Sequence, residues 1–209
     1  MRDSLLWLSH FRHFINELQQ CWDGDSSGTA TGAIEREEPQ VTQFVYGYPT
    51  FSGKRNGDRV SATIDYFHHA VTTKMSRSDH VEMLCLSLKK PQQGFISLRD
   101  LEWFDNTLEL MSTRWQTLTG DPVIDKLYFI EASTPANQAI LALPEFHSLI
   151  KGLLPFSSIA FRVNGIHWSR PIETGAQLAV SLVESVWDGL ASLARLIEQS
   201  SPTADSTSS

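Results

Sequence analysis

The stretch that most constrains the fold of this chain runs from residue 119 to residue 168. It combines strand and helix patterns with few polar interruptions. Within it, Leu127 to Glu131 is an apolar, aromatic run typical of a buried strand, and the Asp121-Pro122 turn ahead of it supplies a start signal. We therefore expect this stretch to form the core of the protein.

The sequence after this strand predicts a pair of helices over residues 134–154. Thr134 offers a hydroxyl that can cap a helix, and Pro135 follows at the first helical position, where its missing N–H is no loss. Pro144 begins the second helix, in which apolar residues recur at spacings of three and four. Beyond it, Asn164-Gly165 predicts a tight hairpin between two short strands.

Strand patterns also dominate residues 43–98. Asn56-Gly57 is the strongest short-range hairpin signal, because a type I′ turn requires positive φ at both central positions. Residues 59–66 alternate between polar and apolar side chains, which is the pattern of a strand with one solvated face. A turn at 76–79 and an apolar strand over 80–88 then predict an antiparallel meander.

Both ends of the chain carry helix patterns. Apolar residues recur at alternating threes and fours over residues 4–22 and again over residues 178–197. Residues 23–40 are polar and glycine-rich, so we expect a mobile loop, and the polar residues 199–209 predict a disordered tail. Residues 100–115 fit both a helix and a strand.

Together these patterns predict one α+β domain over residues 1–198. Its mostly antiparallel sheet is expected to be covered by the N-terminal helix, the paired central helices and the C-terminal helix. A chain of 209 residues is long enough for one domain to bury a core.

The charge of the chain is unevenly distributed. There are 17 Lys and Arg against 24 Asp and Glu, and the formal net charge of −7 argues against a nucleic-acid-binding protein. Residues 54–99 reverse this balance, with 8 basic and 4 acidic side chains. This basic segment could face an acidic partner or could pair with the acidic flanks of its own chain.

Cysteine usage and hydropathy indicate a compartment. Cys21 and Cys85 lie in apolar sequence surroundings and are too few for a disulfide framework, which predicts buried thiols in a reducing cytoplasm. No run reaches the ~18 apolar residues that a membrane span requires. We expect neither a membrane span nor a nucleic-acid partner.

Histidines and carboxylates near the second turn could in principle hold a metal ion. They form two pairs, Asp65/His68 and His80/Glu82. If the connecting turn is tight, His68 faces Leu86, and the two histidine groups lie about 20 Å apart. The sequence therefore predicts no metal site and no cofactor.

Two other clusters of ionisable side chains have structural explanations. His10, His13 and Glu17 share one side of the first helix, opposite its aromatic stripe, and a solvated face accounts for them. Asp121 and Asp125 could act as acid and base. Capping of nearby backbone N–H groups explains them without catalysis, and we predict no catalytic residue.

The motif Thr119-Gly120-Asp121-Pro122, followed by Asp125 and then Phe129-Ile130, resembles a segment of many bacterial proteins of unassigned function. In those proteins, a TGDP turn, two further residues and Asp precede a strand and a pair of helices. Asp58-Arg59-Val60 also resembles a strand that precedes the segment there, whereas Ile124 stands where phenylalanine is usual. The resemblance implies an α+β body and assigns no catalytic residue.

These observations favour a non-catalytic intracellular binding or adaptor protein with a protein partner. The residues expected to contact that partner lie in the basic segment and the N-terminal aromatic stripe, namely Lys54, Arg55, Arg59, Trp7, Phe11 and Phe14. The alternative is a metal-dependent or hydrolytic enzyme that uses the Asp65/His68 or His80/Glu82 neighbourhood. Self-association through the aromatic stripe or the 178–197 face is a further hypothesis.

Overall fold

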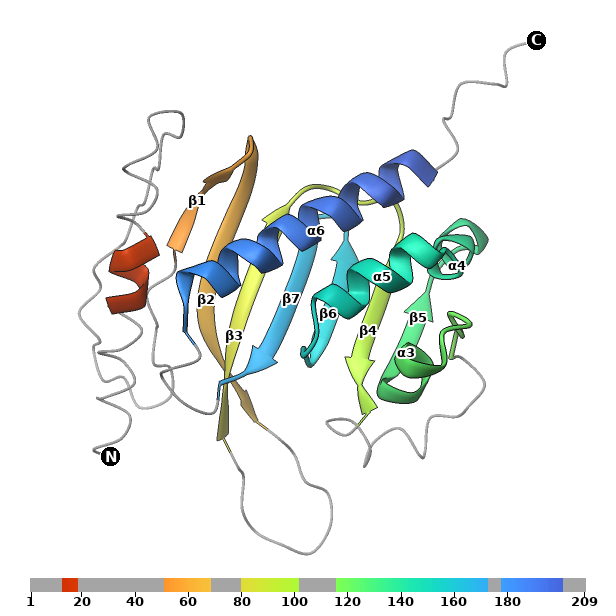
Figure 1. Ribbon diagram of the computed structural model, residues 1–209, viewed down its shortest axis with the longest axis horizontal. Coiled ribbons are helices and arrows are strands. Elements are labelled where there is room, and N and C mark those ends of the chain that lie inside the picture. The colour runs from red at the N-terminus through yellow and green to blue at the C-terminus, as the bar shows by residue number, and fades with distance from the viewer. Residues whose placement is uncertain (1–12, 19–50, 69–79, 102–115, 173–177, 201–209) are drawn as a thin grey trace, which may run out of the picture. The chain divides into compact units, whose positions relative to one another are not determined.

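The computed structural model describes residues 13–18, 51–68, 80–101, 116–172 and 178–200, with the backbone alone at 65–68 and 80–82. Residues 13–18 are helical. The further elements, shown in Figure 1, are β1 (Phe51–Arg55), β2 (Asp58–His68), β3 (His80–Lys89), β4 (Ile96–Asp100), α3 (Pro122–Leu127), β5 (Tyr128–Ala132), α4 (Pro135–Leu141), α5 (Pro144–Gly152), β6 (Ser158–Arg162), β7 (Gly165–Pro171) and α6 (Val180–Ser200).

The predicted α+β class is confirmed. The strand order is β1-β2-β3-β7-β6-β4-β5, and consecutive strands β1, β2 and β3 pair antiparallel, as do β4 with β5 and β4 with β6. Helices occur at the N-terminal, central and C-terminal positions expected for them. The chain divides into two compact units, Met1–Lys89 with Ser169–Trp187 and Lys90–Trp168 with Asp188–Ser209.

In the first unit, the β1–β2 hairpin closes at the predicted Asn56-Gly57 turn. Asn56 has a φ of 52° and Gly57 a φ of 87°, the two positive angles that a type I′ turn requires. The register of the hairpin places Arg55 opposite Asp58 and Lys54 opposite Arg59. The turn therefore fixes which side chains share a face.

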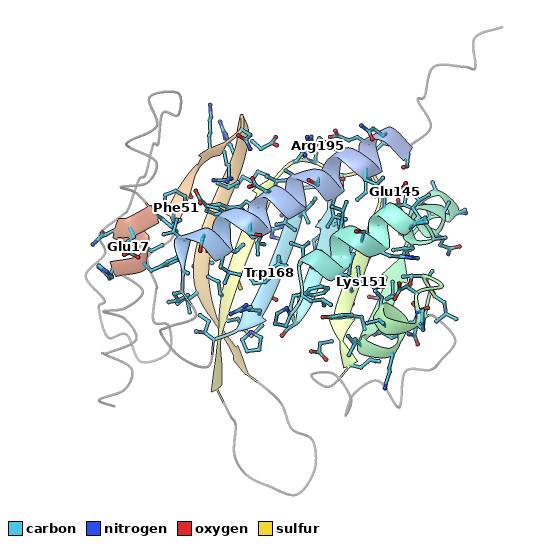
Figure 2. All side chains as sticks on the ribbon, viewed as in Figure 1. Glu17, Phe51, Glu145, Lys151, Trp168 and Arg195 are labelled. Atoms are coloured by element: carbon cyan, nitrogen blue, oxygen red, sulfur yellow. The ribbon has the colours of Figure 1, made fainter. Side chains whose placement is uncertain are left out.

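The alternation predicted for β2 separates an apolar face from a polar one. The apolar face consists of buried residues that stand opposite one another in the register: Val60 with Leu88, Ala62 with Leu86, and Ile64 with Leu84. Phe51 belongs to the same face, since it stands opposite Ala62, and its ring lies 5.9 Å from that of Trp187 on α6. We call this the α6 face. Figure 2 labels Phe51 on β1.

In the second unit, the residues before β5 form a short helix and not the turn that the sequence predicted. Asp121 caps α3, and Pro122 lies in its first turn. Leu127, which was expected to begin the strand, is the last residue of this helix, so β5 starts at Tyr128. The Tyr128 hydroxyl donates a 3.0 Å hydrogen bond to the Phe156 carbonyl, and burial raises the pKa of this phenol.

The paired central helices begin as the sequence predicted. The Thr134 hydroxyl accepts a 3.1 Å hydrogen bond from the Asn137 N–H, and Pro135 is the first residue of α4. Pro144 is likewise the first residue of α5. The Trp168 indole donates to the Leu153 carbonyl just after α5, at 3.4 Å.

Several predictions fall on segments that the structure leaves undescribed. They concern the loop at 23–40, the strand before residue 50, nearly all of 100–115, and most of the tail at 199–209. In the described residues, no helix is both long enough and apolar enough to span a membrane.

Candidate functional site

Three cationic side chains stand in one line across the strands of the first unit. The register places Lys54 opposite Arg59, and Arg59 opposite Lys89. Directly opposed residues in a sheet lie on the same face, with neighbouring strands about 4.8 Å apart. All three residues are exposed. We call Lys54, Arg59 and Lys89 the basic row.

The basic row lies on the face of β1 to β3 opposite the α6 face. Lys54 alternates along β1 with Arg55, whose guanidinium lies 2.8 Å from the Glu184 carboxylate on α6. Because successive strand residues point to opposite faces, Lys54 and its partners in the row lie on the other side. Arg55, expected from the sequence to contact a partner, is thus part of an internal ion pair.

No carboxylate neutralises the basic row in the described part of the chain. Lys54, Arg59 and Lys89 form neither an ion pair nor a side-chain hydrogen bond there. Asp58 stands opposite Arg55 and therefore belongs to the α6 face. The next carboxylate position of β2 on the same face as Arg59 is Asp65, six residues away, or about 20 Å along the strand.

A row of hydroxyl groups lies beside the basic row on the same face. The register places Ser52 opposite Ser61, and Ser61 opposite Ser87. The Ser61 and Ser87 hydroxyl oxygens are 2.5 Å apart and share a hydrogen bond. We call these residues the serine row. It lies two residues, or about 7 Å, along the strands from the basic row.

The basic row is electrostatically unfavourable in the absence of a ligand. Like charges directly opposite each other in a sheet destabilise it, and each such pair costs on the order of 0.2–1 kcal/mol. Arg59 faces a cation on both sides. The arrangement can instead bind an anion, because three charges and neighbouring hydroxyl donors lie on one face.

Phe14 of the N-terminal aromatic stripe differs from the basic row in its exposure. Phe14 is buried, with 1% of its surface exposed, and Ile15 and Leu18 are buried beside it in sequence. Its side chain is therefore inaccessible to a partner in this structure. Trp7 and Phe11 lie outside the described residues.

Asp121 and Asp125 of the TGDP segment accept hydrogen bonds from backbone N–H groups of their own turn. Asp121 Oδ1 accepts hydrogen bonds from the N–H groups of Val123 and Ile124, at 3.0 and 3.2 Å. Asp125 accepts from the Thr119 N–H and hydroxyl, both at 2.8 Å, and its other oxygen accepts from the Gly120 N–H. The predicted capping role of both aspartates is confirmed.

Asp121 is also held by a cation from α5. Its Oδ2 accepts a 2.5 Å hydrogen bond from Lys151 Nζ, while His147 Nδ1 lies 3.9 Å away. Figure 2 labels Lys151, which reaches from α5 towards α3. The bond from Lys151, aided by the backbone N–H groups, lowers the pKa of the Asp121 carboxyl. A carboxylate so held is a poor proton donor.

The register of β2 and β3 corrects the prediction about the histidines. His68 stands opposite His80, and Glu82 stands opposite Tyr66, so the two histidine positions adjoin and are not about 20 Å apart. The physical reason is the register itself, which pairs His68 with His80, whereas the turn expected at 76–79 would have paired His68 with Leu86. His69 lies outside the described residues.

The described side chains contain no group of three His, Cys, Asp or Glu residues placed to bind a metal ion. His13 Nε2 lies 3.4 Å from Glu17 on the exposed side of the helical segment 13–18. Cys85, expected to be buried, is only partly buried and lies on the face of the serine row, opposite Thr63.

The sequence pattern indicated Lys54 and Arg59 but neither Lys89 nor the serine row. The missing information was the pairing of β2 with β3, which places Lys89 opposite Arg59 and Ser87 opposite Ser61. The alternation of Arg59 and Ser61 with apolar residues was a usable signal. It assigns a face within a strand but not the neighbours across it.

Comparison with models of protein families, with curated proteins and with solved structures gave no match. The resemblance of the TGDP segment to bacterial proteins therefore stays a prediction.

The Asp121 cap predicts a specific pH dependence. Because the folded-state pKa of Asp121 is lowered, its contribution to stability is present above the ordinary value of 3.8 and is lost as pH falls through the folded value. We expect D121N to lower the free energy of unfolding at neutral pH and to reduce the loss of stability in acid. Urea unfolding from about pH 2.5 to 7 measures both effects.

The matched control is E145Q, which removes a carboxylate of α5 that has no side-chain partner in the described residues. Its acid limb should follow that of the wild type. An acid limb of D121N indistinguishable from that of the wild type would contradict the assigned role.

Proposed function

We propose that this protein is a non-catalytic recognition or adaptor protein that binds an acidic segment of a partner protein. Binding takes place on the face of β1 to β3 that carries the basic row and the serine row. The reducing cytoplasm is the proposed location. Self-association is compatible with this role but is not needed for it.

The observation that carries the proposal is the difference between the two faces of one sheet. On the α6 face, the cation Arg55 is paired with Glu184. On the other face, Lys54, Arg59 and Lys89 are aligned, exposed and unpaired in the described part of the chain. The chain as a whole is acidic, so the lack of a partner for these three residues does not reflect a shortage of carboxylates.

An acidic ligand would relieve the repulsion within the basic row. Complementary charge across an interface also steers encounter and selects partners, chiefly through the association rate. Hydroxyl donors beside the cations add hydrogen bonds to the same anionic groups. These features favour recognition over a purely structural role for the row.

The carboxylates that could have supported catalysis are otherwise engaged. Asp121 and Asp125 accept hydrogen bonds from backbone N–H groups of their own turn, and Asp121 also pairs with Lys151. Both groups stabilise the start of α3, which supports a structural role for the motif.

Reversal of charge in the basic row tests the proposal. A fluorescent octaglutamate peptide serves as probe, and its binding is followed by anisotropy. We expect the variant K54E/R59E/K89E to bind at least about tenfold more weakly than the wild type, a change of 1.4 kcal/mol or more. Wild-type affinity should fall steeply as salt screens the charges.

A control variant, K126E/R162E/R195E, makes the same change in net charge at exposed or partly exposed positions outside β1 to β3. It should retain at least about half of the wild-type affinity if binding is local to the basic row. Equal losses in both variants would show that net charge alone governs binding, and would overturn the proposal.

One observation favours the alternative, a metal-dependent or hydrolytic enzyme. The register places His68 opposite His80, with Glu82 two residues farther along β3. Imidazole and carboxylate are common zinc ligands. In the alternative, the histidine pair and Glu82 hold the ion.

Metal analysis of the purified protein tests this alternative. Stoichiometric zinc that is lost in H68A/H80A and retained in H13A/H167A would support it. Less than about a tenth of an equivalent after incubation with excess Zn²⁺ would exclude a zinc-dependent enzyme.

A further inference from the structure

The basic row and the serine row together point to a more specific ligand. Resting on the function proposed above, we infer that the acidic group is a phosphate monoester on a phosphorylated segment of the partner protein. It binds over Arg59, between Lys54 and Lys89, with the serine row at its side.

The density of positive charge in the basic row favours a phosphate. Three cations stand opposite one another on adjacent strands, separated by about 4.8 Å from strand to strand. One carboxylate supplies a single negative charge, whereas a phosphate monoester carries about −1.5 to −2 at neutral pH and offers three strong acceptor oxygens. A phosphate therefore offsets more of the repulsion within the row from a single position.

The order of the cations along the basic row also suits a phosphate. Arg59 is in the middle of the row and Lys54 and Lys89 are at its ends. A guanidinium presents a planar fork that can bond two oxygens of one phosphate, while lysine ammonium groups act as compact charges that can approach from either side. The central position suits the residue with the more directional donors.

Neutral hydrogen-bond donors lie beside the cations. The Ser61 and Ser87 hydroxyls share one hydrogen bond, so one hydroxyl hydrogen of the pair is left to donate elsewhere. Ser52 is exposed and its hydroxyl has no partner in the described residues. These hydroxyls can donate hydrogen bonds to acceptor oxygens that the cations do not contact. A phosphate has such oxygens, whereas a single carboxylate largely lacks them.

Other phosphate-bearing ligands fit the row less well. Binding along a nucleic acid requires cations that follow many phosphates, and the chain has a net charge of −7. Attraction to an anionic membrane requires clusters of about 4–8 basic residues. Three cations in a single short row match one phosphate group.

Three peptides that differ at one position test the inference. Each has four alanines on either side of a central serine, phosphoserine or glutamate. Titration is followed by amide chemical shifts of the labelled full-length protein, which also show that each variant is folded. We expect phosphoserine peptide to bind at least about fivefold more tightly than glutamate peptide, with shifts at Ser52, Lys54, Arg59, Ser61 and Lys89.

Variants separate the two rows. R59Q should reduce binding of both acidic peptides, whereas S52A/S61A/S87A should reduce binding of the phosphoserine peptide more than that of the glutamate peptide. The single variant S52A changes an exposed residue and so serves if the triple variant does not fold. The assigned role of the hydroxyls would be overturned if S52A/S61A/S87A and S52A kept the wild-type ratio of affinities for the phosphoserine and glutamate peptides.

The outcomes also distinguish this inference from the function on which it rests. Equal affinity for glutamate and phosphoserine peptides, with shifts in the basic row, would overturn the phosphate inference and leave acidic recognition in place. Absence of binding by both peptides and by octaglutamate would overturn both. Binding to vesicles containing 30% phosphatidylserine without binding to the phosphoserine peptide would replace the inference with a membrane surface.

Discussion

The antiparallel register of β1, β2 and β3 is the constraint on which this account depends. It divides the cations of one segment between two faces of the sheet. Arg55 falls on the α6 face and pairs with Glu184, while Lys54, one residue earlier, falls on the other face with Arg59 and Lys89. The same register aligns three serines beside them. A shift of one residue in either pairing would disperse both rows, because side chains alternate with a period of two.

Features set by neighbouring residues could be predicted from the sequence. The Asn56-Gly57 turn, the Thr134 cap and the helix start at Pro144 each depend on the conformational preferences of a few adjacent residues. The short helix α3 was mistaken for a turn, since a cap followed by proline can begin either. The Asp121 carboxylate caps the N-terminus of this helix by accepting two hydrogen bonds from backbone N–H groups.

Strand pairing could not be predicted in the same way. The alternation of polar and apolar residues assigns each side chain to a face of the sheet but does not name its partner on the next strand. The turn expected at 76–79 implies a register in which His68 is remote from His80 and Lys89 does not stand opposite Arg59, whereas the observed register makes both pairs. The sequence therefore indicated only Lys54 and Arg59 among the residues of the candidate site.

The central claim is that the basic row is a like-charge cluster that the unbound fold tolerates at a cost. The most direct test is the free energy of unfolding of R59Q and wild type, measured by urea denaturation at about 0.02 M and 0.5 M salt. Because R59Q removes two like-charge pairs, we predict that it is more stable by roughly 0.4–2 kcal/mol at low salt, and that the difference shrinks at high salt as the repulsion is screened. An R59Q variant that is less stable than wild type at low salt, or a difference independent of salt, would contradict it.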